Sequence, residues 1–282
     1  MAPGLYFLAT PIGTARDITL RALDILASAE VIAAEDTRSL RKLMEIHGVP
    51  LEGRRILAYH DHSGAGARGQ LIAALEAGQS VAYASEAGMP LIADPGYDLG
   101  RAAAEAGFPV TVAPGPSAAL AALTLAGLPT DAFFFEGFLP NAQGARRSRL
   151  EELKPIPGTL IFYESPKRAA ASLADMALVL GADRQAALCR ELTKKFEEVR
   201  RGTLAELAEG ASETPPRGEI VILVDRGHSE VVNAADLESD LRMALEAHSV
   251  RDAADLVAKM HGQKRREVYQ LALQLSKGGT DG

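Results

Sequence analysis

Short strand-like runs alternate with amphipathic segments along the first half of this chain, and this alternation limits the possible folds more than any other feature. The strand-like runs cover residues 5–9, 31–34, 55–60, 81–84 and 110–113. Several of the intervening helical segments stop at a glycine, the residue that commonly closes a helix: Gly48, Gly78, Gly107 and Gly127. Because such alternation usually builds parallel strands, we expect an α/β lobe with helices on both faces of its sheet.

The pattern changes twice further along the chain. Strand-like runs at 133–135, 159–163, 186–189, 196–201 and 219–225 have less helix between them, which predicts a mixed second sheet, with residues 128–131 as the linker. After Gly227 only helical periodicity remains, over 235–247, 253–261 and 264–275. We therefore expect an α/β lobe over 1–115, a second α/β lobe over 116–227 and a helical, helix-turn-helix-like tail over 233–282.

Composition argues against several classes of protein. The chain has 282 residues with a formal net charge of −7, so a general nucleic-acid coat is disfavoured, although local basic patches are not. Its single cysteine, Cys189, excludes an internal disulfide and a cysteine-based metal cluster. No apolar run approaches the length of a membrane span, and the first residues lack a secretory pattern. We expect a cytoplasmic protein with no membrane contact and no bound metal.

Two turns rich in glycine and proline follow predicted strands, at 85–96 and at 113–118. Glycine lets the backbone approach a ligand closely, and free amides at a helix start point toward the crevice of an α/β sheet. Both turns could also be ordinary strand-to-helix connections. Together they predict a small-molecule site built largely from backbone.

A dinucleotide site is a competing interpretation, because the glycines of residues 64–69 match the spacing GxGxxG and Glu86 follows at a distance suited to a ribose. Three residues, Asp61, His62 and Ser63, separate these glycines from the preceding strand. That separation loosens the tight turn on which the dinucleotide fingerprint depends, so we disfavour this reading.

Polar clusters stand at the ends of three predicted strands, at 35–38, 59–62 and 190–194. Charged residues at such positions often form structural salt bridges. The histidines of the 59–62 cluster, His60 and His62, do not have the spacing of known metal-ligand motifs. Three clusters at equivalent topological positions nevertheless favour one shared cleft.

Ten short motifs follow one another in order along the chain. They are Thr10-Pro-Ile-Gly13, Asp17-Ile-Thr-Leu-Arg21, Glu35-Asp-Thr-Arg38, Tyr59-His-Asp-His62, Asp94-Pro-Gly96, Pro114-Gly-Pro-Ser-Ala118, Gly127-Leu-Pro129, Phe135-Glu-Gly-Phe-Leu-Pro140, Phe162-Tyr-Glu-Ser-Pro166 and Arg190-Glu-Leu-Thr-Lys194. Together they resemble the bacterial 16S ribosomal RNA cytidine 2′-O-methyltransferases of the tetrapyrrole methylase superfamily. The resemblance covers residues 5 to about 226, and the helical tail is similar to the small domain that these enzymes carry.

The resemblance implies S-adenosylmethionine in a cleft between the lobes, a homodimer, and methylation of a cytidine ribose 2′-hydroxyl in the decoding region of 16S rRNA within the 30S subunit. A tetrapyrrole C-methyltransferase, acting on uroporphyrinogen or a precorrin, is the alternative with the same fold. The chain departs from the family pattern at Thr14 and Ala15, at Glu86, at Met89 and at Lys167. Glu86 lengthens a carboxylate and Met89 removes a hydroxyl beside the expected cofactor loop.

Three sets of site residues follow from the turns, the polar clusters and the resemblance. The expected cofactor contacts are Ser85, Glu86, Ala87, Gly88, Ser117, Ala118, Tyr163, Leu192 and Ile220. A ribose hydroxyl needs a proton acceptor or a cation beside it, and the candidates are Glu35, Asp36, His60, His62, Glu191 and Lys194. The expected RNA contacts are Arg38, Arg146, Arg147, Arg149, Lys264, Arg265 and Arg266.

The arginines at 146–149 are included because cations at a helix N-terminus oppose its dipole and therefore favour an external phosphate. The alternative is that they pair with Glu151 or Glu152 at the surface.

Overall fold

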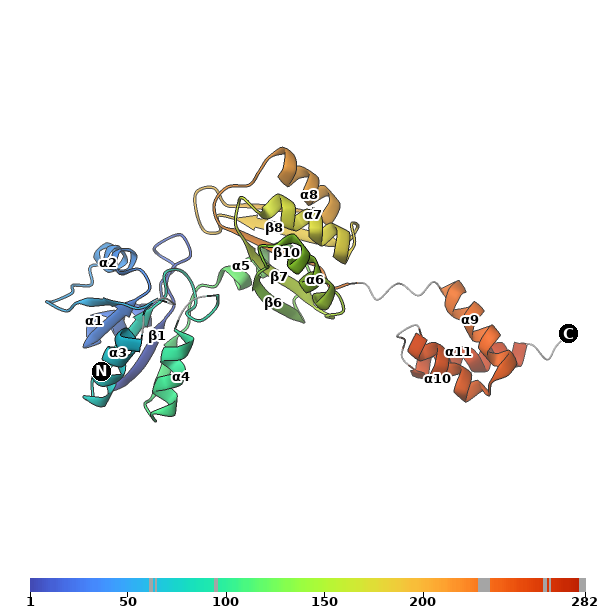
Figure 1. Cartoon of the computed structure of the whole chain (residues 1–282), viewed down its shortest axis with the longest axis horizontal. Helices are drawn as coiled ribbons and strands as arrows, with labels where there is room; N and C mark the ends of the chain where they lie inside the picture. The colour runs from blue at the N-terminus through green and yellow to red at the C-terminus, as the bar shows by residue number, and fades with distance from the viewer. Residues whose placement is uncertain are drawn as a thin grey trace. The chain divides into compact units, whose positions relative to one another are not determined.

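The chain forms two compact units, Met1–Arg226 and Gly227–Gly282, in the computed structural model (Figure 1). The structure describes residues 1–60, 63, 65–93, 96–227, 234–260, 263 and 265–278. The first unit contains both predicted sheets, and the described residues of the second form only helices and their connections.

The first sheet is entirely parallel, as the alternation predicts. Its strand order is β3-β2-β4-β1-β5, and every neighbouring pair in it runs parallel. The strands are β1 (Gly4–Leu8), β2 (Val31–Ala34), β3 (Ile56–Ala58), β4 (Ser80–Ala84) and β5 (Val110–Ala113). The crossover helices are α1 (Leu20–Ser28), α2 (Thr37–Ile46), α3 (Ala65–Glu76) and α4 (Tyr97–Glu105).

Both faces of this sheet are covered. One core cluster joins α1 and α2 to strand residues such as Leu8, Ile32 and Ala82. A second cluster joins α3 and α4 to the opposite face through residues such as Leu5 and Tyr83. Alternate residues of a strand point to opposite faces, so nearly continuous apolar strands supply both clusters. The carboxyl ends of the five strands are left free for loops.

The second sheet is mixed, as expected, with strand order β6-β7-β10-β8-β9. Only β6 and β7 run parallel; the remaining pairs are antiparallel. The strands are β6 (Phe133–Phe138), β7 (Thr159–Glu164), β8 (Gln185–Arg190), β9 (Glu198–Thr203) and β10 (Ile220–Val224). The helices of this lobe are α5 (Ala118–Ala126), α6 (Gln143–Leu153), α7 (Ala169–Leu180) and α8 (Leu204–Glu213).

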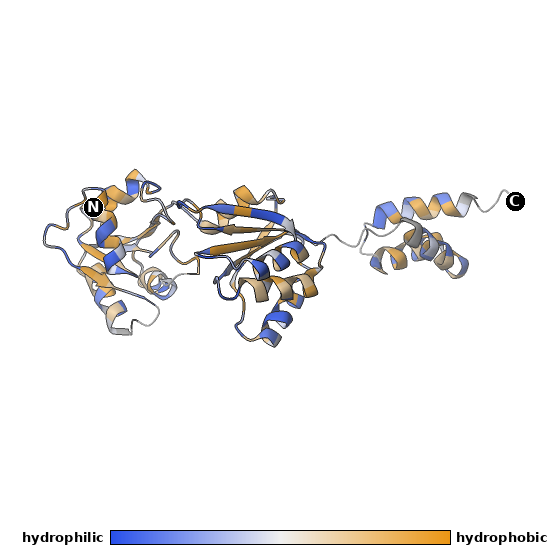
Figure 2. Ribbon diagram, turned by 90° about the horizontal axis from the view of Figure 1, so that it is seen from above, coloured by the Kyte–Doolittle hydropathy of each residue, from blue (hydrophilic) through white to orange (hydrophobic). Residues whose placement is uncertain are grey.

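Helices α6, α7 and α8 cover one face of the second sheet, and α5 covers the other. Figure 2 shows the hydrophobic strands of this sheet lying against their helices. Because α5 packs on the second sheet through Ala122 and Leu123, the chain enters the second lobe before α5. The linker expected at 128–131 is therefore wrong: those residues follow a helix that already belongs to the second lobe.

The second unit is built from α9 (Ala234–Ala247), α10 (Val250–Met260) and α11 (Arg265–Gly278). Its core contains side chains from all three helices, including Leu241, Val257 and Val268. Within the described ranges, no helix of either unit is long and apolar enough to cross a membrane.

Capping side chains mark the starts of two helices. Helix α1 begins at Leu20, because the Thr19 side chain accepts a hydrogen bond from the Ala22 amide and caps it. The helix expected from 253 begins at Val250, after Ser249, whose hydroxyl accepts from the Asp252 amide at 3.2 Å.

Candidate functional site

A pocket of about 370 Å³ lies between the two lobes of the first unit. Its walls are loops that follow β1, β4, β5, β7 and β8, together with the end of β6 and the start of β10. The first lobe and the start of α5 contribute Ile12, Ala87, Gly88, Met89, Ile92, Ala93, Ser117 and Ala118. The remainder of the second lobe contributes Phe138, Tyr163, Glu164, Ser165, Pro166, Leu192, Gly218, Glu219, Ile220 and Val221.

The loop after β4 is held against the loop after β1 by a short two-way bridge. The Thr10 amide donates to the Gly88 carbonyl at 3.0 Å, and the Gly88 amide donates to the Thr10 carbonyl at 2.9 Å. The buried Ser85 hydroxyl also donates to the Gly88 carbonyl, at 2.5 Å. Gly88 has φ of +81°, where glycine is strongly favoured. These bonds fix a backbone segment along the pocket wall.

The two lobes meet where the loop after β1 contacts residues 190–197, which we call the β8–β9 loop. The Thr14 amide donates to the Thr193 hydroxyl at 3.1 Å. A Cβ atom at Gly13 would lie 2.5 Å from that hydroxyl oxygen and 2.9 Å from the Leu192 carbonyl oxygen. A residue without a side chain is therefore required here, and the close approach places Leu192 against the pocket.

The β8–β9 loop carries Lys194, whose ammonium lies between two carboxylates. Its Nζ is 3.1 Å from Glu191 Oε1 and 2.9 Å from Glu219 Oε2. Burial opposes the charged ammonium, but the hydrogen bonds to Glu219 and Glu191 outweigh it and raise the pKa of Lys194. The hydrogen bond from the Glu219 amide, followed by Lys194, lowers the pKa of Glu191. Glu191 and Thr193 both adopt left-handed backbone conformations, which are strained for residues other than glycine.

Acidic side chains gather on the first-lobe side of this cleft. The Glu86 amide donates to Glu35 Oε2 at 3.4 Å. Partial burial raises the pKa of Glu86, and the negative charges of Glu35, Asp36 and Glu219 raise it further. Within the part of the chain that the structure describes, no three His, Cys, Asp or Glu side chains are arranged to hold a metal ion.

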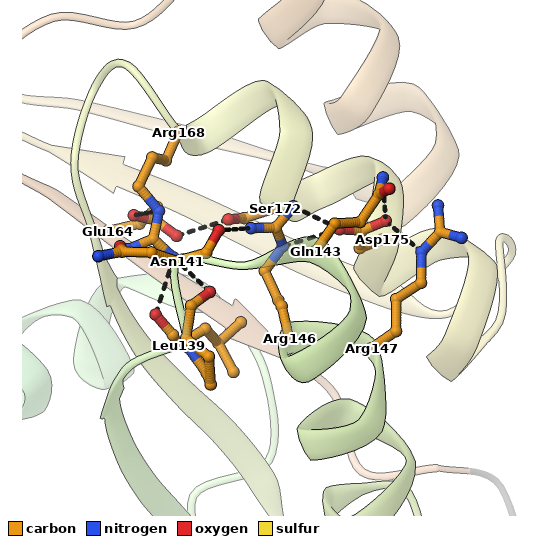
Figure 3. A network of polar contacts seen from close by, with 10 residues as sticks. Leu139, Asn141, Gln143, Arg146, Arg147, Glu164, Arg168, Ser172 and Asp175 are labelled. Carbon is orange, nitrogen blue, oxygen red and sulfur yellow. Dashed lines mark hydrogen bonds and ion pairs between the residues drawn. The ribbon is translucent and has the colours of Figure 1, made fainter.

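Glu164 forms a buried part of the pocket wall at the end of β7. Its carboxylate accepts from the Ser172 hydroxyl at 2.5 Å and from the Ser165 amide at 2.8 Å. Arg168 lies 3.3 Å from the same carboxylate, and its guanidinium also donates to the Leu139 carbonyl (Figure 3). Burying a polar group without hydrogen bonds is costly, so this network holds the loop after β7 in place.

Seven of the nine expected cofactor contacts line the pocket: Ala87, Gly88, Ser117, Ala118, Tyr163, Leu192 and Ile220. The other two, Ser85 and Glu86, lie on the same loop without lining it. Ser85 is buried, and its hydroxyl hydrogen-bonds to the Gly88 carbonyl. Glu86 is exposed and lies near the carboxylates of Glu35 and Asp36.

The expected catalytic candidates separate into two groups. Glu191 and Lys194 join Glu219 beside the pocket, and Glu35 lies next to the Glu86 backbone. His60 follows β3, the edge strand farthest from β5, and does not line the pocket. His62 lies outside the described residues.

The expectation that Arg146 contacts RNA is wrong. Its side chain is only 6% exposed, and its guanidinium contacts Asp175 at 2.6 and 2.7 Å (Figure 3). Arg147, 43% exposed, pairs with the same carboxylate at 2.7 Å, and Arg149 pairs with Glu136 and Glu152. We expected an external phosphate to balance the arginines at the start of α6, but the carboxylate of Asp175, on α7, supplies that negative charge within the protein.

Three of the other expected RNA contacts, Arg38, Arg265 and Arg266, lie among the described residues. Arg38 and Arg266 are exposed. Arg265 forms an ion pair with Asp255 within the second unit, and Lys264 lies outside the described residues. Arg38 belongs to the first unit and Arg265 and Arg266 to the second, and their contact with RNA stays a prediction.

Sequence reasoning did not select several residues that line the pocket, notably Ile12, Phe138, Glu164 and Glu219. The first three belong to motifs that carried the family resemblance, so motif membership could have identified them. Glu219 stands at the start of a strand, and only the antiparallel pairing of β10 brings that end to the cleft.

Comparison with known proteins agrees with the predicted resemblance. The family model described as Tetrapyrrole (Corrin/Porphyrin) Methylases matches residues 4–208, and the model described as RsmI C-terminal HTH domain matches residues 231–276. A relative from Mesorhizobium japonicum, named ribosomal RNA small subunit methyltransferase I, is 48% identical over 100% of this chain and 95% of its own length. A relative of the same name from Escherichia coli O157:H7 is 43% identical over 96% of this chain and 94% of its own.

Solved structures share the two-lobed fold at low sequence identity. The uroporphyrin-III C-methyltransferase of Thermus thermophilus, complexed with S-adenosylhomocysteine, has a TM-score of 0.56 and 21% identity, covering 82% of this chain and 99% of that one. A diphthine synthase has a TM-score of 0.60 and 14% identity, covering 78% and 90%. At these identities the likeness confirms the predicted fold class and nothing finer.

Proposed function

This chain belongs to the tetrapyrrole methylase family, and on that premise we propose that it methylates small-subunit ribosomal RNA with S-adenosylmethionine as the methyl donor. It is an S-adenosylmethionine-dependent methyltransferase by family. The observation that carries the proposal is the pocket between the lobes, with the fixed Gly88 backbone on one wall and Lys194 held beside Glu219 on the other. The named relatives at 48% and 43% identity support the choice of RNA.

The pocket fits the cofactor. Its volume of about 370 Å³ lies within the roughly 300–1,000 Å³ typical of small-molecule sites. Apolar side chains such as Ile12 and Leu192 suit an adenosine, and the absence of a side chain at Gly88 lets the ligand approach the backbone closely. Glu219, the exposed carboxylate of the lining, suits a positively charged group. We propose that the seven lining residues predicted from the sequence hold the cofactor, with Ser85 supporting their loop.

More specifically, we propose that the acceptor is the 2′-hydroxyl of a cytidine ribose in the decoding region of 16S rRNA within the 30S subunit. This finer assignment rests on the ordered motifs that resemble such enzymes. The protein would then act in the cytoplasm, where its substrate is assembled.

Lys194 supplies the electrostatic part of the proposed reaction. When bound, S-adenosylmethionine supplies an electrophilic methyl group on a positively charged sulfur. Because its raised pKa keeps Lys194 protonated, it is suited to stabilise negative charge developing on the attacking ribose oxygen, and it is unsuited to accept the proton. Glu191 and Glu219 hold the ammonium in place. We propose that the proton passes to a carboxylate of this cleft, and the candidates are Glu219 and Glu35.

Methyl-labelled S-adenosylmethionine distinguishes this proposal from the tetrapyrrole alternative. The protein is incubated with the labelled cofactor and either 30S subunits or uroporphyrinogen. We expect label in 16S rRNA and, after complete nuclease digestion, in 2′-O-methylcytidine. Label in the tetrapyrrole, or in a base rather than a ribose, would refute the proposal.

We also propose a homodimer in which a second copy covers the β5 edge of the first sheet. Val110 and Val112 on this edge are exposed, as is Tyr97 beside them, and all three line one shallow groove. An unpaired apolar edge strand is usually covered. Light scattering at micromolar concentration tests this: the wild-type protein should have a dimer mass, and Val110→Lys with Val112→Lys a monomer mass. Leu178→Lys, at an exposed site on α7, is the control.

A further inference from the structure

The β8–β9 loop presents an exposed aromatic ring next to the cofactor pocket. We propose that Phe196, with Lys195 beside it, is a stacking site for an unpaired nucleobase of the RNA substrate. This inference rests on the proposed function and names a substrate contact within it. No motif considered in the sequence had singled out either residue.

The exposure of Phe196 is the first observation. The residue is 61% exposed, and the Lys195 ammonium lies 5.5 Å from the ring centroid. An exposed aromatic ring gains nothing from burial in the folded chain, so packing does not account for it. Proteins that bind single-stranded nucleic acid stack bases on such rings and use neighbouring cations for the phosphates.

The second observation is that the ring stands on a fixed loop. The Thr193 amide donates to the Glu197 carboxylate at 2.7 Å, and the Glu197 amide donates to the Lys194 carbonyl at 3.1 Å. Arg190 and Glu198 close the base of the loop with a contact of 2.5 Å. A ring on a preorganised loop loses little conformational entropy when a base stacks on it.

The third observation is position. Leu192, four residues before Phe196, lines the pocket, and the Lys194 ammonium between them is 2.9 Å from Glu219 on the pocket wall. A base stacked on Phe196 would therefore belong to the target nucleotide or to one of its near neighbours in the RNA.

Two exposed cations also lie near Phe196. Lys195 is its neighbour in the chain, and Arg217 lies beside the base of the loop, because its carbonyl accepts from Arg190 at 3.5 Å. Lys195 and Arg217 can therefore contact the phosphates of an RNA strand whose base stacks on Phe196.

Steady-state kinetics with 30S subunits test the proposal. Phe196→Ala should raise the KM for 30S subunits about tenfold, in line with the loss of one base–aromatic stack, and leave the Kd for S-adenosylmethionine unchanged. Phe196→Tyr should restore most of the affinity for the subunit. The control is Phe133→Ala: Phe133 is another exposed aromatic of the same lobe, at the opposite end of β6 from the pocket-lining Phe138. That variant should keep the wild-type KM.

Fluorescence gives a second readout that does not depend on turnover. The chain contains no tryptophan, so Phe196→Trp introduces a single reporter. A short oligocytidylate should quench its emission, and should leave that of a Phe133→Trp protein unchanged.

Three results would overturn the inference. They are an unchanged KM for an active Phe196→Ala enzyme, equal quenching at positions 196 and 133, or conversion of a dimer to a monomer by Phe196→Ala, which would make the ring a contact between copies. Failure of the wild-type protein to methylate 30S subunits would instead refute the proposed function, and quenching at position 196 would then still report a nucleic-acid contact.

Discussion

Asp175 is the buried carboxylate on which the α6–α7 contact depends, and its removal should destabilise the protein strongly. Its side chain is 2% exposed and accepts from Arg146 at 2.6 and 2.7 Å and from Arg147 at 2.7 Å. In Asp175→Ala, the 6%-exposed guanidinium of Arg146 keeps its hydrogen bond to the Asn141 carbonyl at 3.1 Å but loses its counter-charge. Removing one partner of a buried ion pair typically costs about 3–5 kcal/mol.

Thermal unfolding monitored by circular dichroism measures this loss. At roughly 2–4 °C per kcal/mol for domains of this size, the Tm should fall by about 10 °C. Arg147→Ala is the matched control, because it removes a 43%-exposed partner of the same carboxylate and should change the stability by less than about 1 kcal/mol. The double variant Arg146→Met with Asp175→Leu should recover most of the lost stability, since no buried charge is left unpaired.

The pH dependence provides an independent check. Burial alone would raise the pKa of Asp175, but Arg147 and Arg146 outweigh it and hold that pKa below its usual range. A carboxylate with a lowered pKa stabilises the fold above its unfolded-state pKa, near 4, and loses that contribution as the pH falls through its folded-state value. The double variant should lack this acid-dependent loss. A Tm for Asp175→Ala within 2 °C of wild type, or an equal drop in Arg147→Ala, would refute the reasoning.

Three further predictions concern the cleft. Gly88→Val should weaken S-adenosylmethionine binding at least tenfold in calorimetry, because a Cβ at φ of +81° would lie 3.2 Å from Ile12; Gly78→Val, at φ of +76° with nothing within 4 Å, should bind normally. Glu86→Gln should raise the Tm at pH 7, because a carboxyl with a raised pKa loses its stabilising contribution as the pH rises, and the gain should vanish below about pH 4; a constant gain across pH would contradict this. Lys194→Met should lower kcat about 100-fold with 30S subunits, and an unchanged kcat would exclude Lys194 from transition-state stabilisation.

The sequence by itself determined the order of elements, the parallel first sheet and the mixed second one. Each of these depends on local patterns: alternation within a strand, the apolar face of a helix, and a glycine at the helix end. It also located the loops that form the pocket, because the carboxyl ends of parallel strands meet at one edge whatever the details of packing. Gly88 and Ser117 follow strands of this sheet, so the sequence alone was enough to place them at the edge where the pocket lies.

Only the tertiary structure decided which charges are available to a ligand. Arg146 stands in a basic run in the sequence, yet Asp175, 29 residues later, neutralises it, because α6 and α7 pack side by side on the second sheet. Glu219 joins Lys194 because β10 runs antiparallel to β8. Ion pairs and exposure depend on distances between elements that are remote in the chain, and periodicity within one element carries no information about those distances.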